Sequence, residues 1–371
     1  MPAGARPQCG GWPSSGYYRR QRGYPLASSS TPVTVTIQEV ADLAKVSPKT
    51  VSRVINNEPR VRPATRARIL QAIDELNYRP NLNARGLASN RSFLIGLFCD
   101  RPGDYLSEFQ AGAVERCRES NLHLMVEPWD VKSPNLEKQI DTLLGQLRLE
   151  GIILLPPLSD HRLVLTKLQE AAIPVVRVAP QDQLNTAPSV GIDDYAAARE
   201  VTAHLLNLGH RRIGFILGHP GHGATEQRYL GFVDELRAHQ VAVVPELVQT
   251  GNFTFADGLI CAERMLRAAV PPTAIFASND DMAAAVVSMA RKFGLDLPRQ
   301  LSVAGFDDAP LATQIWPELT TVRQPVAAMA RRAADLIIRL EPRRNGWPER
   351  MPRHLFDHEL IVRNSTARPG R

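Results

Sequence analysis

Several kinds of sequence feature are scarce or absent in this chain of 371 residues. The four cysteines (Cys9, Cys99, Cys117 and Cys261) are scattered, and their spacing fits neither a disulfide framework nor a zinc site. No apolar run approaches the ~20 residues that cross a bilayer. The N-terminus, rich in Gly, Pro, Ser and Arg, lacks the apolar segment of a secretory signal. These absences predict a cytoplasmic protein with no membrane partner.

Motifs for nucleotide binding and catalysis are also missing. Neither GxGxxG after a strand nor GxxxxGK[ST] occurs, and no nucleophile–base pair stands out. His219 and His222 in GHPGHGATEQR suggest zinc, but no carboxylate or cysteine at ligand spacing supports them. We therefore expect no catalytic residue, no metal site and no cofactor.

What the sequence does contain is an uneven charge. The net charge is +6, but residues 1–32 carry four arginines and no acid, which gives +4. Residues 33–92 carry ten basic and five acidic residues (+5), and the remaining 279 residues carry 30 and 33 (−3). A basic front on a mildly acidic body suggests a nucleic-acid partner, although a charged tail on a solvated surface explains the charge equally well. Nothing in residues 1–32 suggests packing, and we expect a disordered tail there.

Three helix signals follow the tail in quick succession. In TIQEVADLA, Thr36 and Glu39 have the spacing of a capping box. In SPKTVSRVI, Ser47 is the expected N-cap, and Pro48 takes the first helical position, where its missing N–H costs nothing. The third helix is PATRARILQAIDELNY, residues 63–78, with its apolar residues at helical spacing.

The first two helices are joined by only KVS, which is the pattern of a helix-turn-helix. Val51, Val54 and Ile55 can pack inward on the second helix. Its outward face then carries Pro48, Lys49, Ser52 and Arg53. The N-terminal residues of such a helix meet base edges in the major groove, where arginine pairs bidentately with guanine and lysine reaches a guanine or a phosphate.

From Ser92 onward the pattern changes to alternating strands and helices. Short apolar runs recur as FLIGLF, GIILL, IPVVRV, RIGFILG, TAIFAS and LSVAGF, with amphipathic stretches between them. Continuous apolar strands alternating with helices predict parallel sheets covered on both faces. About 280 residues exceed what one such sheet needs, so we expect two α/β lobes.

These residues together resemble one family of regulators. The stretch VTIQEVADLAKVSPKTVSRVINNEPRVRPATRARILQAIDELNYRPNLNARGLAS is similar to the DNA-binding head of lactose/galactose-repressor (LacI/GalR) proteins. The similarity continues through HLLNLGHRRIGFILG, RYLGF, AIFASNDDMAAAV, LSVAGFDD and LTTVRQP. It implies a helix-turn-helix head (33–79), a hinge helix (80–91) and a two-lobed core like periplasmic sugar-binding proteins (92–371). The expected crossovers between lobes lie near residues 190 and 320 and near the C-terminus.

The resemblance assigns DNA contacts by position. Pro48, Lys49 and Arg53 match major-groove readers, and residues 81–88 match a hinge helix that folds only on operator DNA. Within it, Leu87 matches the leucine wedged at the central base step of the minor groove, and Ala84 the small residue beside it. Arg62 departs from the family's usual Ser or Thr N-cap. The full set of predicted DNA contacts is Thr36, Ser47, Pro48, Lys49, Thr50, Ser52, Arg53, Asn56, Tyr78, Asn81, Ala84 and Leu87.

The resemblance also assigns an effector cleft, and the residue chemistry agrees with it. Sugars are bound by planar donor and acceptor groups, often beside an aromatic ring. Arg228, Asn279 and Asp307 match effector contacts and lie near the carboxyl ends of expected strands, where α/β folds bind ligands. Phe253 matches an aromatic cleft residue. Further candidates are Asp193 and two residues of the DRPGDYL loop, Asp100 and Tyr105, although this loop departs from the NPFF that is commoner in the family. We expect Asp280 to cap or brace its own helix and not to contact the effector.

The sequence therefore predicts a ligand-responsive repressor of carbohydrate-utilisation genes. It would bind a palindromic double-stranded operator through the major groove and the central minor groove, and a small sugar would release it. Alternatives are a purine- or nucleoside-responsive regulator, a corepressor-dependent regulator, and, remotely, a sugar-binding protein without DNA regulation. No leucine-heptad extension follows the core, so we expect a homodimer. We expect the protein in the cytoplasm, associated with the nucleoid.

Overall fold

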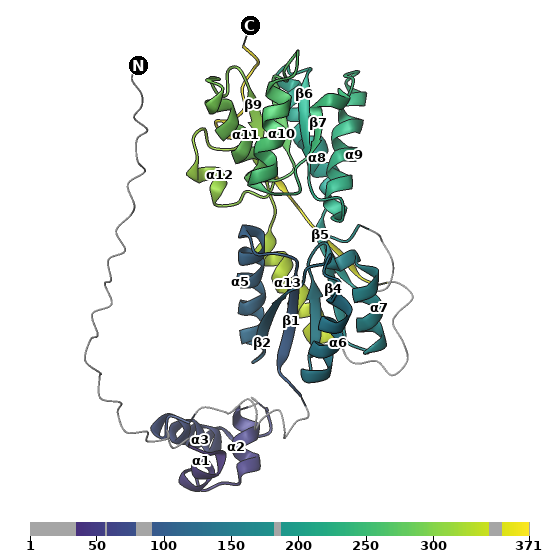
Figure 1. Cartoon of the computed structure of the whole chain (residues 1–371). Coiled ribbons are helices and arrows are strands. Elements are labelled where there is room, and N and C mark those ends of the chain that lie inside the picture. Colours follow the sequence, from purple (N-terminus) through teal and green to yellow (C-terminus); the bar gives the residue numbers. More distant parts are fainter. Residues whose placement is uncertain (1–34, 56–57, 79–90, 182–186, 341–350, 371) are drawn as a thin grey trace, which may run out of the picture. The chain divides into compact units, whose positions relative to one another are not determined.

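The computed structural model describes residues 35–55, 58–78, 91–181, 187–340 and 351–370 (Figure 1). Contacts divide the chain into a head, Met1–Asn81, and a core, Leu82–Arg371. The expected tail and hinge helix lie outside the described residues, as do four predicted DNA contacts: Asn56, Asn81, Ala84 and Leu87. No helix in the described part of the chain has both the length and the apolar character needed to cross a bilayer.

The head contains three helices, α1 (Ile37–Leu43), α2 (Pro48–Ile55) and α3 (Pro63–Glu75). The capping box at α1 is confirmed: Thr36 Oγ1 accepts from the Glu39 amide, and the Glu39 carboxylate accepts from the Thr36 amide at 2.6 Å. This reciprocal pairing satisfies two amides that a helix start leaves without partners. The helix starts that we predicted for the head are therefore present.

A small apolar core holds the three helices together. Its buried residues come from all three, namely Val40, Ala41, Ala44, Val51, Val54, Ile69 and Ala72. Each sits at helical spacing, so burying one face of α2 leaves its polar face outward. The third helix begins less securely, because Arg62 makes no side-chain cap and only Pro63 marks the start.

The first lobe of the core is a six-stranded parallel sheet with the order β11-β5-β4-β3-β1-β2. Its strands are β1 (Leu94–Cys99), β2 (His123–Pro128), β3 (Gly151–Leu154), β4 (Val175–Val178), β5 (Ser189–Ile192) and β11 (Arg353–Phe356). Its helices are α5 (Asp104–Glu119), α6 (Leu136–Gln146), α7 (Arg162–Glu170) and α13 (Val326–Arg339), with a short 3-10 turn η1 (Leu158–Asp160). Helices α5 and α13 pack on one face and α6 and α7 on the other. Both faces are thus buried, which explains the uninterrupted apolar strands.

The second lobe is a four-stranded parallel sheet with the order β7-β6-β8-β9. Its strands are β6 (Ile213–Leu217), β7 (Val248–Thr250), β8 (Ala274–Ala277) and β9 (Ser302–Ala304). Its helices are α8 (Asp194–Asn207), α9 (Gly223–Ala238), α10 (Phe255–Leu266), α11 (Asp280–Lys292) and α12 (Leu311–Gln314), with a 3-10 turn η2 (Pro245–Leu247). Helices α8 and α9 cover one face, and α10 and α11 cover the other.

The chain passes between the lobes three times. It does so between β5 and α8, between β10 (Thr321–Arg323) and α13, and between β11 and β12 (Glu359–Ile361). Strands β10 and β12 pair antiparallel beside the second lobe, where Ala304 of β9 bridges to Thr320. The fold class predicted from the sequence, a helix-turn-helix head with a two-lobed parallel α/β core, is confirmed.

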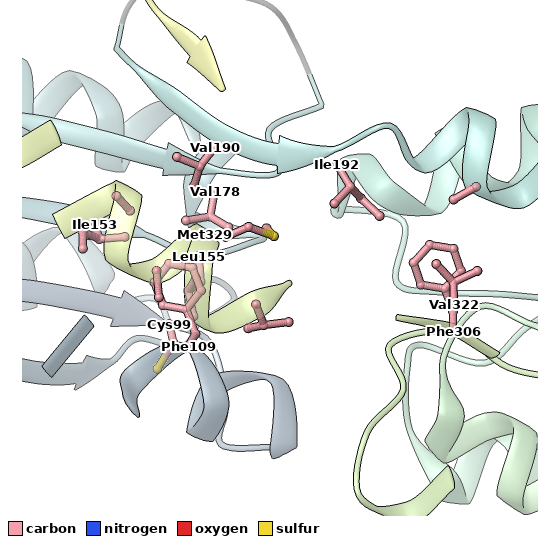
Figure 2. Packing of buried hydrophobic residues seen from close by; sticks show 14 of the residues in the cluster. Cys99, Phe109, Ile153, Leu155, Val178, Val190, Ile192, Phe306, Val322 and Met329 are labelled. Carbon is pink, nitrogen blue, oxygen red and sulfur yellow. The ribbon is translucent and has the colours of Figure 1, made fainter. Parts of the chain in front are cut away.

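Buried apolar side chains continue from one lobe toward the other (Figure 2). Ile153, Val178 and Val190 of the first sheet pack with Met329 of α13. Ile192, at the end of β5, lies on the side facing the second lobe, where Phe306 and Val322 are found. Such burial contributes about 25 cal/mol per Å² of apolar surface removed from water. It therefore anchors the crossing strands as well as each lobe.

The uncapped start of α3 gives a testable expectation. Replacing Arg62 with Ser should stabilise the first turn by about 1 kcal/mol, because a serine oxygen at the N-cap accepts from an otherwise unpaired amide. Hydrogen exchange of the full chain should then slow roughly fivefold in α3. Arg60→Ser, which removes the same charge outside the cap position, is the matched control. Equal slowing in both variants would show that charge, not capping, is responsible.

Candidate functional site: a recognition helix and an interlobe cleft

The polar face of α2 is the first candidate site. Ser47, Lys49 and Arg53 are exposed, while Val51 and Val54 face the core of the head. Ser47 caps the helix, since its Oγ accepts from the Thr50 amide at 3.3 Å. The described candidates therefore share one accessible face, from the N-cap of α2 to its last turn.

The guanidinium of Arg53 has only a weak competing partner. Its Nε lies 3.6 Å from a Glu58 carboxylate oxygen, and both side chains are close to half exposed. An exposed pair of this kind contributes at most about 1 kcal/mol, so Arg53 can exchange it for another partner at little cost. Pro48, Thr50 and Ser52 are partly buried beside it.

Two predicted DNA contacts lie away from α2 and also have structural roles. Thr36 is engaged in the capping box of α1. Tyr78 follows α3 and packs partly against the apolar core of the head, and burial raises the pKa of its hydroxyl. The contacts that fold the head therefore already fix the positions from which Thr36 and Tyr78 would contact DNA.

The second candidate site is a cleft in the core, with a cavity volume of about 200 Å³. Its lining follows the carboxyl ends of strands from both sheets: Asp100 follows β1, Asn279 follows β8 and Asp307 follows β9. This is the edge at which open α/β sheets bind ligands. Of the seven predicted effector residues, six line the cleft: Asp100, Tyr105, Arg228, Phe253, Asn279 and Asp307.

Arg228 of α9 is the most constrained of these residues. Its Nε donates to Asp194 at 2.8 Å, and its Nη1 donates to the Ser278 carbonyl oxygen. The guanidinium carbon stands 3.5 Å from the ring centroid of Phe306. Arg228 and Asp194 are both buried, so the pair is far less screened by water than a surface pair. The second lobe thus presents a fixed, charge-balanced donor to the cleft.

Asp194, not Asp193, is the aspartate that reaches the cleft. Asp193 is exposed and caps α8, where its side chain accepts from the Ala196 amide at 2.9 Å, and it lies outside the cleft lining. The neighbouring carboxylate turns inward to Arg228 instead. A helix start places successive side chains about 100° apart, so one residue decides which carboxylate faces inward.

Asp307 faces the cleft in an unusual state. Its Oδ1 accepts from Gln324 Nε2 at 2.7 Å and lies 3.9 Å from Arg228 Nη1. Burial raises the pKa of this carboxyl to about 7, against the opposing effect of Arg228 and the Gln324 hydrogen bond. Near neutral pH the group can therefore either donate or accept a hydrogen bond.

Asn279 and Phe253 depend on one another. Asn279 caps α11 by accepting from the Met282 amide at 3.1 Å, and its Nδ2 donates to the Phe253 carbonyl at 3.3 Å. Phe253 has a φ of 59°, and its ring packs so closely over Gly218 that a Cβ there would overlap it. The glycine that ends RIGFILG is thus required by the position of the aromatic ring.

The first lobe contributes Asp100 and Tyr105. Asp100 lies 3.4 Å from the Nε of Arg101, which also lines the cleft. Tyr105 packs beside Phe109 with ring centroids 6.3 Å apart, and burial raises the pKa of its hydroxyl. A neutral phenol at this position can donate to a ligand oxygen.

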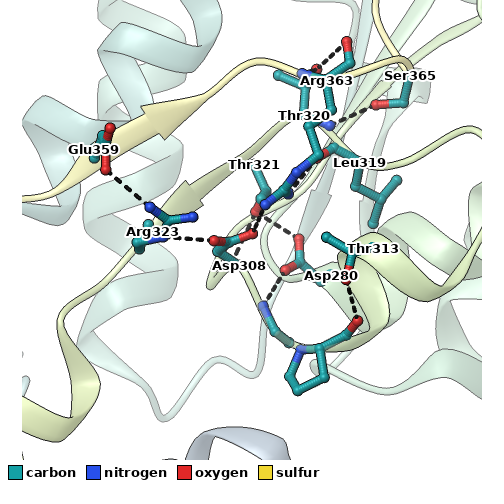
Figure 3. A network of polar contacts seen from close by, with 12 residues as sticks. Asp280, Asp308, Thr313, Leu319, Thr320, Thr321, Arg323, Glu359, Arg363 and Ser365 are labelled. Atoms are coloured by element: carbon teal, nitrogen blue, oxygen red, sulfur yellow. Dashed lines mark hydrogen bonds and ion pairs between the residues drawn. The ribbon is translucent and has the colours of Figure 1, made fainter.

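A polar network holds the loop that carries Asp307 (Figure 3). Asp280, buried at the start of α11, accepts from Thr321 Oγ1 at 2.7 Å and from the Ala309 amide at 2.8 Å. These contacts brace the loop and β10, whereas the sequence predicts that Asp280 caps or braces its own helix. Asp308 accepts from Arg323 at 2.7 Å and pairs with Arg363 at 2.6 Å. These contacts hold Asp307 and Asp308 at φ values of 110° and 54°, a region that costs non-glycine residues about 1–3 kcal/mol each.

His222 was not predicted to contact the effector, but it lines the cleft. Its ring lies 5.1 Å from that of Phe253, and its Nε2 has no hydrogen-bond partner among the described residues. Burial lowers the pKa of this imidazole to about 3, which keeps it neutral. His219 Nδ1 accepts from the Gly221 amide at 3.0 Å. The described residues contain no group of three or more potential metal ligands.

The polar residues of the cleft lining that sequence reasoning did not assign to the effector are Arg101, Asp104, Asp194, His222, Asp280, Asp281 and Gln324. Gln324 lies in the motif LTTVRQP, and Asp194 directly follows the candidate Asp193. His222 was considered only as a metal ligand. For Gln324 and Asp194, the only indication in the sequence was their proximity to these positions. Proximity in sequence does not reveal the direction in which a side chain points.

Comparison with known proteins identifies both parts of the chain, the head and the core. Residues 36–81 match the profile of bacterial regulatory proteins of the lacI family, and residues 202–366 match a periplasmic binding protein-like domain. The chain is 33% identical over 300 residues to catabolite control protein A of Priestia megaterium, which covers 79% of this chain and 89% of that protein. Nothing in these matches points to an enzyme.

Two solved structures show the same architecture. The lac repressor dimer bound to operator and the anti-inducer ONPF superposes with a TM-score of 0.74 at 26% identity, covering 90% of this chain and 99% of that one. The transcriptional regulator CelR in complex with cellobiose superposes with a TM-score of 0.67 at 29% identity, covering 89% and 99%. The head and the two-lobed core thus occur together in both.

The raised pKa of Asp307 predicts a pH dependence of stability. The carboxyl titrates near 3.8 in the unfolded chain and near 7 in the folded core, so the folded state binds more protons between these values. The free energy of unfolding should therefore fall as the pH rises through this window. Asp307→Asn, which keeps an acceptor for Gln324, should flatten the decline of melting temperature between pH 5 and 7. Asp234→Asn, a carboxyl outside the cleft, is the control, and unchanged slopes in both variants would contradict the assignment.

Proposed function

Because the chain belongs to the LacI family of bacterial regulatory proteins, we propose that it represses carbohydrate-utilisation genes by binding a near-palindromic operator, from which a small sugar releases it. The observation that supports this proposal is that one chain contains both a helix with an exposed polar face, α2, and a polar cleft between two lobes. The chain is a regulator and not an enzyme. Its two sites act by binding alone.

On the DNA side, α2 enters the major groove and its first turns meet base edges. Arg53 pairs with a guanine, and Lys49 contacts a guanine or a phosphate. Thr36, Ser47, Thr50, Asn56 and Tyr78 position the head on the backbone. Phosphate contacts of this kind make the affinity fall steeply with salt.

The hinge completes the DNA-binding surface in this proposal. By resemblance, Asn81, Ala84 and Leu87 enter the central minor groove, where Leu87 wedges into the base step and kinks the duplex. Gly86 lowers the helical stability of this segment by about 1 kcal/mol relative to alanine. A segment of low intrinsic stability suits an element that folds only on its target.

On the effector side, the cleft offers the groups that hold adjacent hydroxyls. Arg228, Asn279, Gln324 and Asp307 supply planar donors and acceptors, and Phe253 supplies an aromatic face. CelR binds cellobiose in a related core, which supports a sugar here. A purine or nucleoside would find the same aromatic and amide groups, and it remains the second candidate.

Effector and operator binding are coupled through the two lobes. A ligand that contacts both lobes favours their closure, and closure alters the relative position of the two hinge segments in a homodimer. Each ligand then weakens the other by the same factor, with a coupling free energy of about 1–3 kcal/mol. A corepressor would reverse the sign of the effect without changing the geometry.

The proposed assembly is a homodimer, so that two heads bind two half-sites at fixed spacing. The lac repressor relative is a dimer on its operator. Trp316, which is 65% exposed, is a large apolar side chain that a subunit interface would cover. A protein that acts on the bacterial chromosome works in the cytoplasm, in association with the nucleoid.

Selection from a random pool of double-stranded DNA with the purified full chain tests the proposal. We expect enrichment of a palindrome with a central CG step, and the genes beside genomic matches should encode sugar metabolism. The selected duplex then serves to test release by sugars and by purines. Failure to enrich any sequence, with and without these ligands, would refute the regulator proposal.

Substitution of Arg53 tests the reading helix. Arg53→Ala should weaken binding to the selected operator by about 1–3 kcal/mol while leaving non-specific binding nearly unchanged, because a bidentate guanine contact discriminates between bases. Fluorescence anisotropy with the operator and a scrambled duplex measures both affinities. Arg299→Ala, an exposed arginine of the core, is the charge control. An equal loss of affinity for both duplexes would show that Arg53 contacts a phosphate and does not read a base.

A further inference from the structure

The charges that line the cleft are strongly unbalanced. The described lining contains six aspartates but only two arginines and one histidine. The aspartates are Asp100, Asp104, Asp194, Asp280, Asp281 and Asp307. A group of acidic residues does not by itself define a ligand. The charge of the ligand that the cleft can bind depends on which of the lining charges already have an ion-pair partner.

Both arginines of the lining are already matched by a carboxylate. Arg228 is held by Asp194 at 2.8 Å on two of its nitrogens and lies 3.9 Å from Asp307. Arg101 pairs with Asp100 at 3.4 Å. A guanidinium has five N–H groups, so Arg228 keeps donors for ligand hydroxyls while its charge is balanced. An anionic ligand would therefore find hydrogen bonds but no unmatched positive charge on these residues.

The remaining base is neutral. His222 is half-buried beside Phe253, and its low pKa leaves the imidazole uncharged at any physiological pH. Its Nε2, which has no partner within the described structure, is suited to a hydroxyl. His222 thus adds a polar atom to the cleft but no attraction for phosphate or carboxylate.

Asp280 has no ion-pair partner among the described residues, but it accepts from Thr321 Oγ1 and the Ala309 amide, and burial raises its pKa well above the usual value. Three other carboxylates remain incompletely balanced. Asp104 opens α5 in the first lobe and Asp281 lies in the first turn of α11 in the second lobe; neither has an ion-pair partner among the described residues. Both line the cleft and are exposed to solvent there, and the charge of Asp104 raises the pKa of Asp281 after the larger effect of burial. Asp307 is the third; it lies 3.9 Å from Arg228 Nη1, and with a pKa of about 7 it carries its negative charge in only part of the molecules at neutral pH.

Helix dipoles oppose this effect but do not cancel it. The N-termini of α5 and α11 open onto the cleft, and each is equivalent to about half a positive charge. Each already has a carboxylate in its first turn, with a full negative charge when ionised. The balance at both helix ends therefore stays negative.

We propose that the cleft takes polyhydroxylated effectors that carry no negative charge, and that Asp104, Asp281 and Asp307 exclude their phosphorylated and carboxylated counterparts. This inference rests on the proposed function, since it concerns the effector of the same cleft. A phosphate or carboxylate would approach Asp104 and Asp281 as the lobes close, and like charges brought together in a closing cleft repel strongly. Hydroxyl groups meet no such penalty, and an amine is attracted.

Matched ligand sets test the proposal on the full chain. Glucose, glucose 6-phosphate, glucuronate and glucosamine form one set, the corresponding galactose compounds a second, cellobiose with cellobionate a third, and adenosine with AMP a fourth. Calorimetry gives each affinity, and anisotropy with the selected operator gives each effect on DNA binding. We expect a neutral member to bind and its anionic counterpart to bind at least roughly tenfold more weakly. The amine should bind no more weakly than the neutral compound.

The double variant Asp104→Asn/Asp281→Asn identifies the cause. The ratio of neutral to anionic affinity should fall roughly tenfold, because two negative charges are removed from the cleft. Glu170→Gln/Asp296→Asn, which removes two charges outside the lining, should leave the ratio unchanged. Thermal melting verifies that each variant is folded.

Three results would overturn the inference. They are an anionic member that binds the unmodified chain as tightly as its neutral counterpart, an unchanged ratio in the double variant, and no binding by any member of the panel. The DNA-binding half of the proposed function would survive all three, because selection of the operator from random DNA requires no effector.

Discussion

The arrangement of the cleft depends on the buried pair between Arg228 and Asp194. Arg228 joins four segments that are distant in sequence: its own helix α9, the start of α8, the carbonyl of Ser278 after β8 and the ring of Phe306 after β9. Breaking a buried pair by removing one partner costs about 3–5 kcal/mol, because the other charge is left without compensation. The same pair that fixes the lining also balances its positive charge. Structural support and selectivity thus come from one interaction.

The loop of Asp307 and Asp308 connects this cleft to the crossing strands. Asp307 faces the ligand space, while Asp308 binds Arg323 of β10 and Arg363 just beyond β12 (Figure 3). Both residues hold backbone angles that are costly for aspartate, and the surrounding contacts sustain them. A ligand that contacts Asp307 therefore acts on a loop that is bonded, through Asp308, to β10 and to the segment after β12. These belong to two of the three chain passages between the lobes. This gives effector binding a short physical route to the relative position of the lobes.

Much of this structure was predictable from local patterns, and the misses have physical causes. The helices of the head were predicted because capping residues and apolar spacing agree, as at Thr36 and Pro48. The strands buried on both faces, such as β3 and β8, were visible as apolar runs. Strand β2, largely half-buried, shows no such run, and β10 to β12 are short. In the cleft, the choice between Asp193 and Asp194 depends on one helical step of rotation. The role of His222 depends on packing against Phe253, which lies 31 residues later in the chain.

The interleaved path of the chain through the core has a consequence for its synthesis. The first lobe needs α13 and β11, which are translated after the whole second-lobe sheet, to complete its packing. The second lobe needs Ser365, whose hydroxyl binds Val303, and Ala367, whose carbonyl lies 2.9 Å from His210 Nε2. Neither lobe can therefore finish folding while the ribosome still holds the last segment. The head, built from contiguous residues, emerges first and can fold long before the core that is to control it.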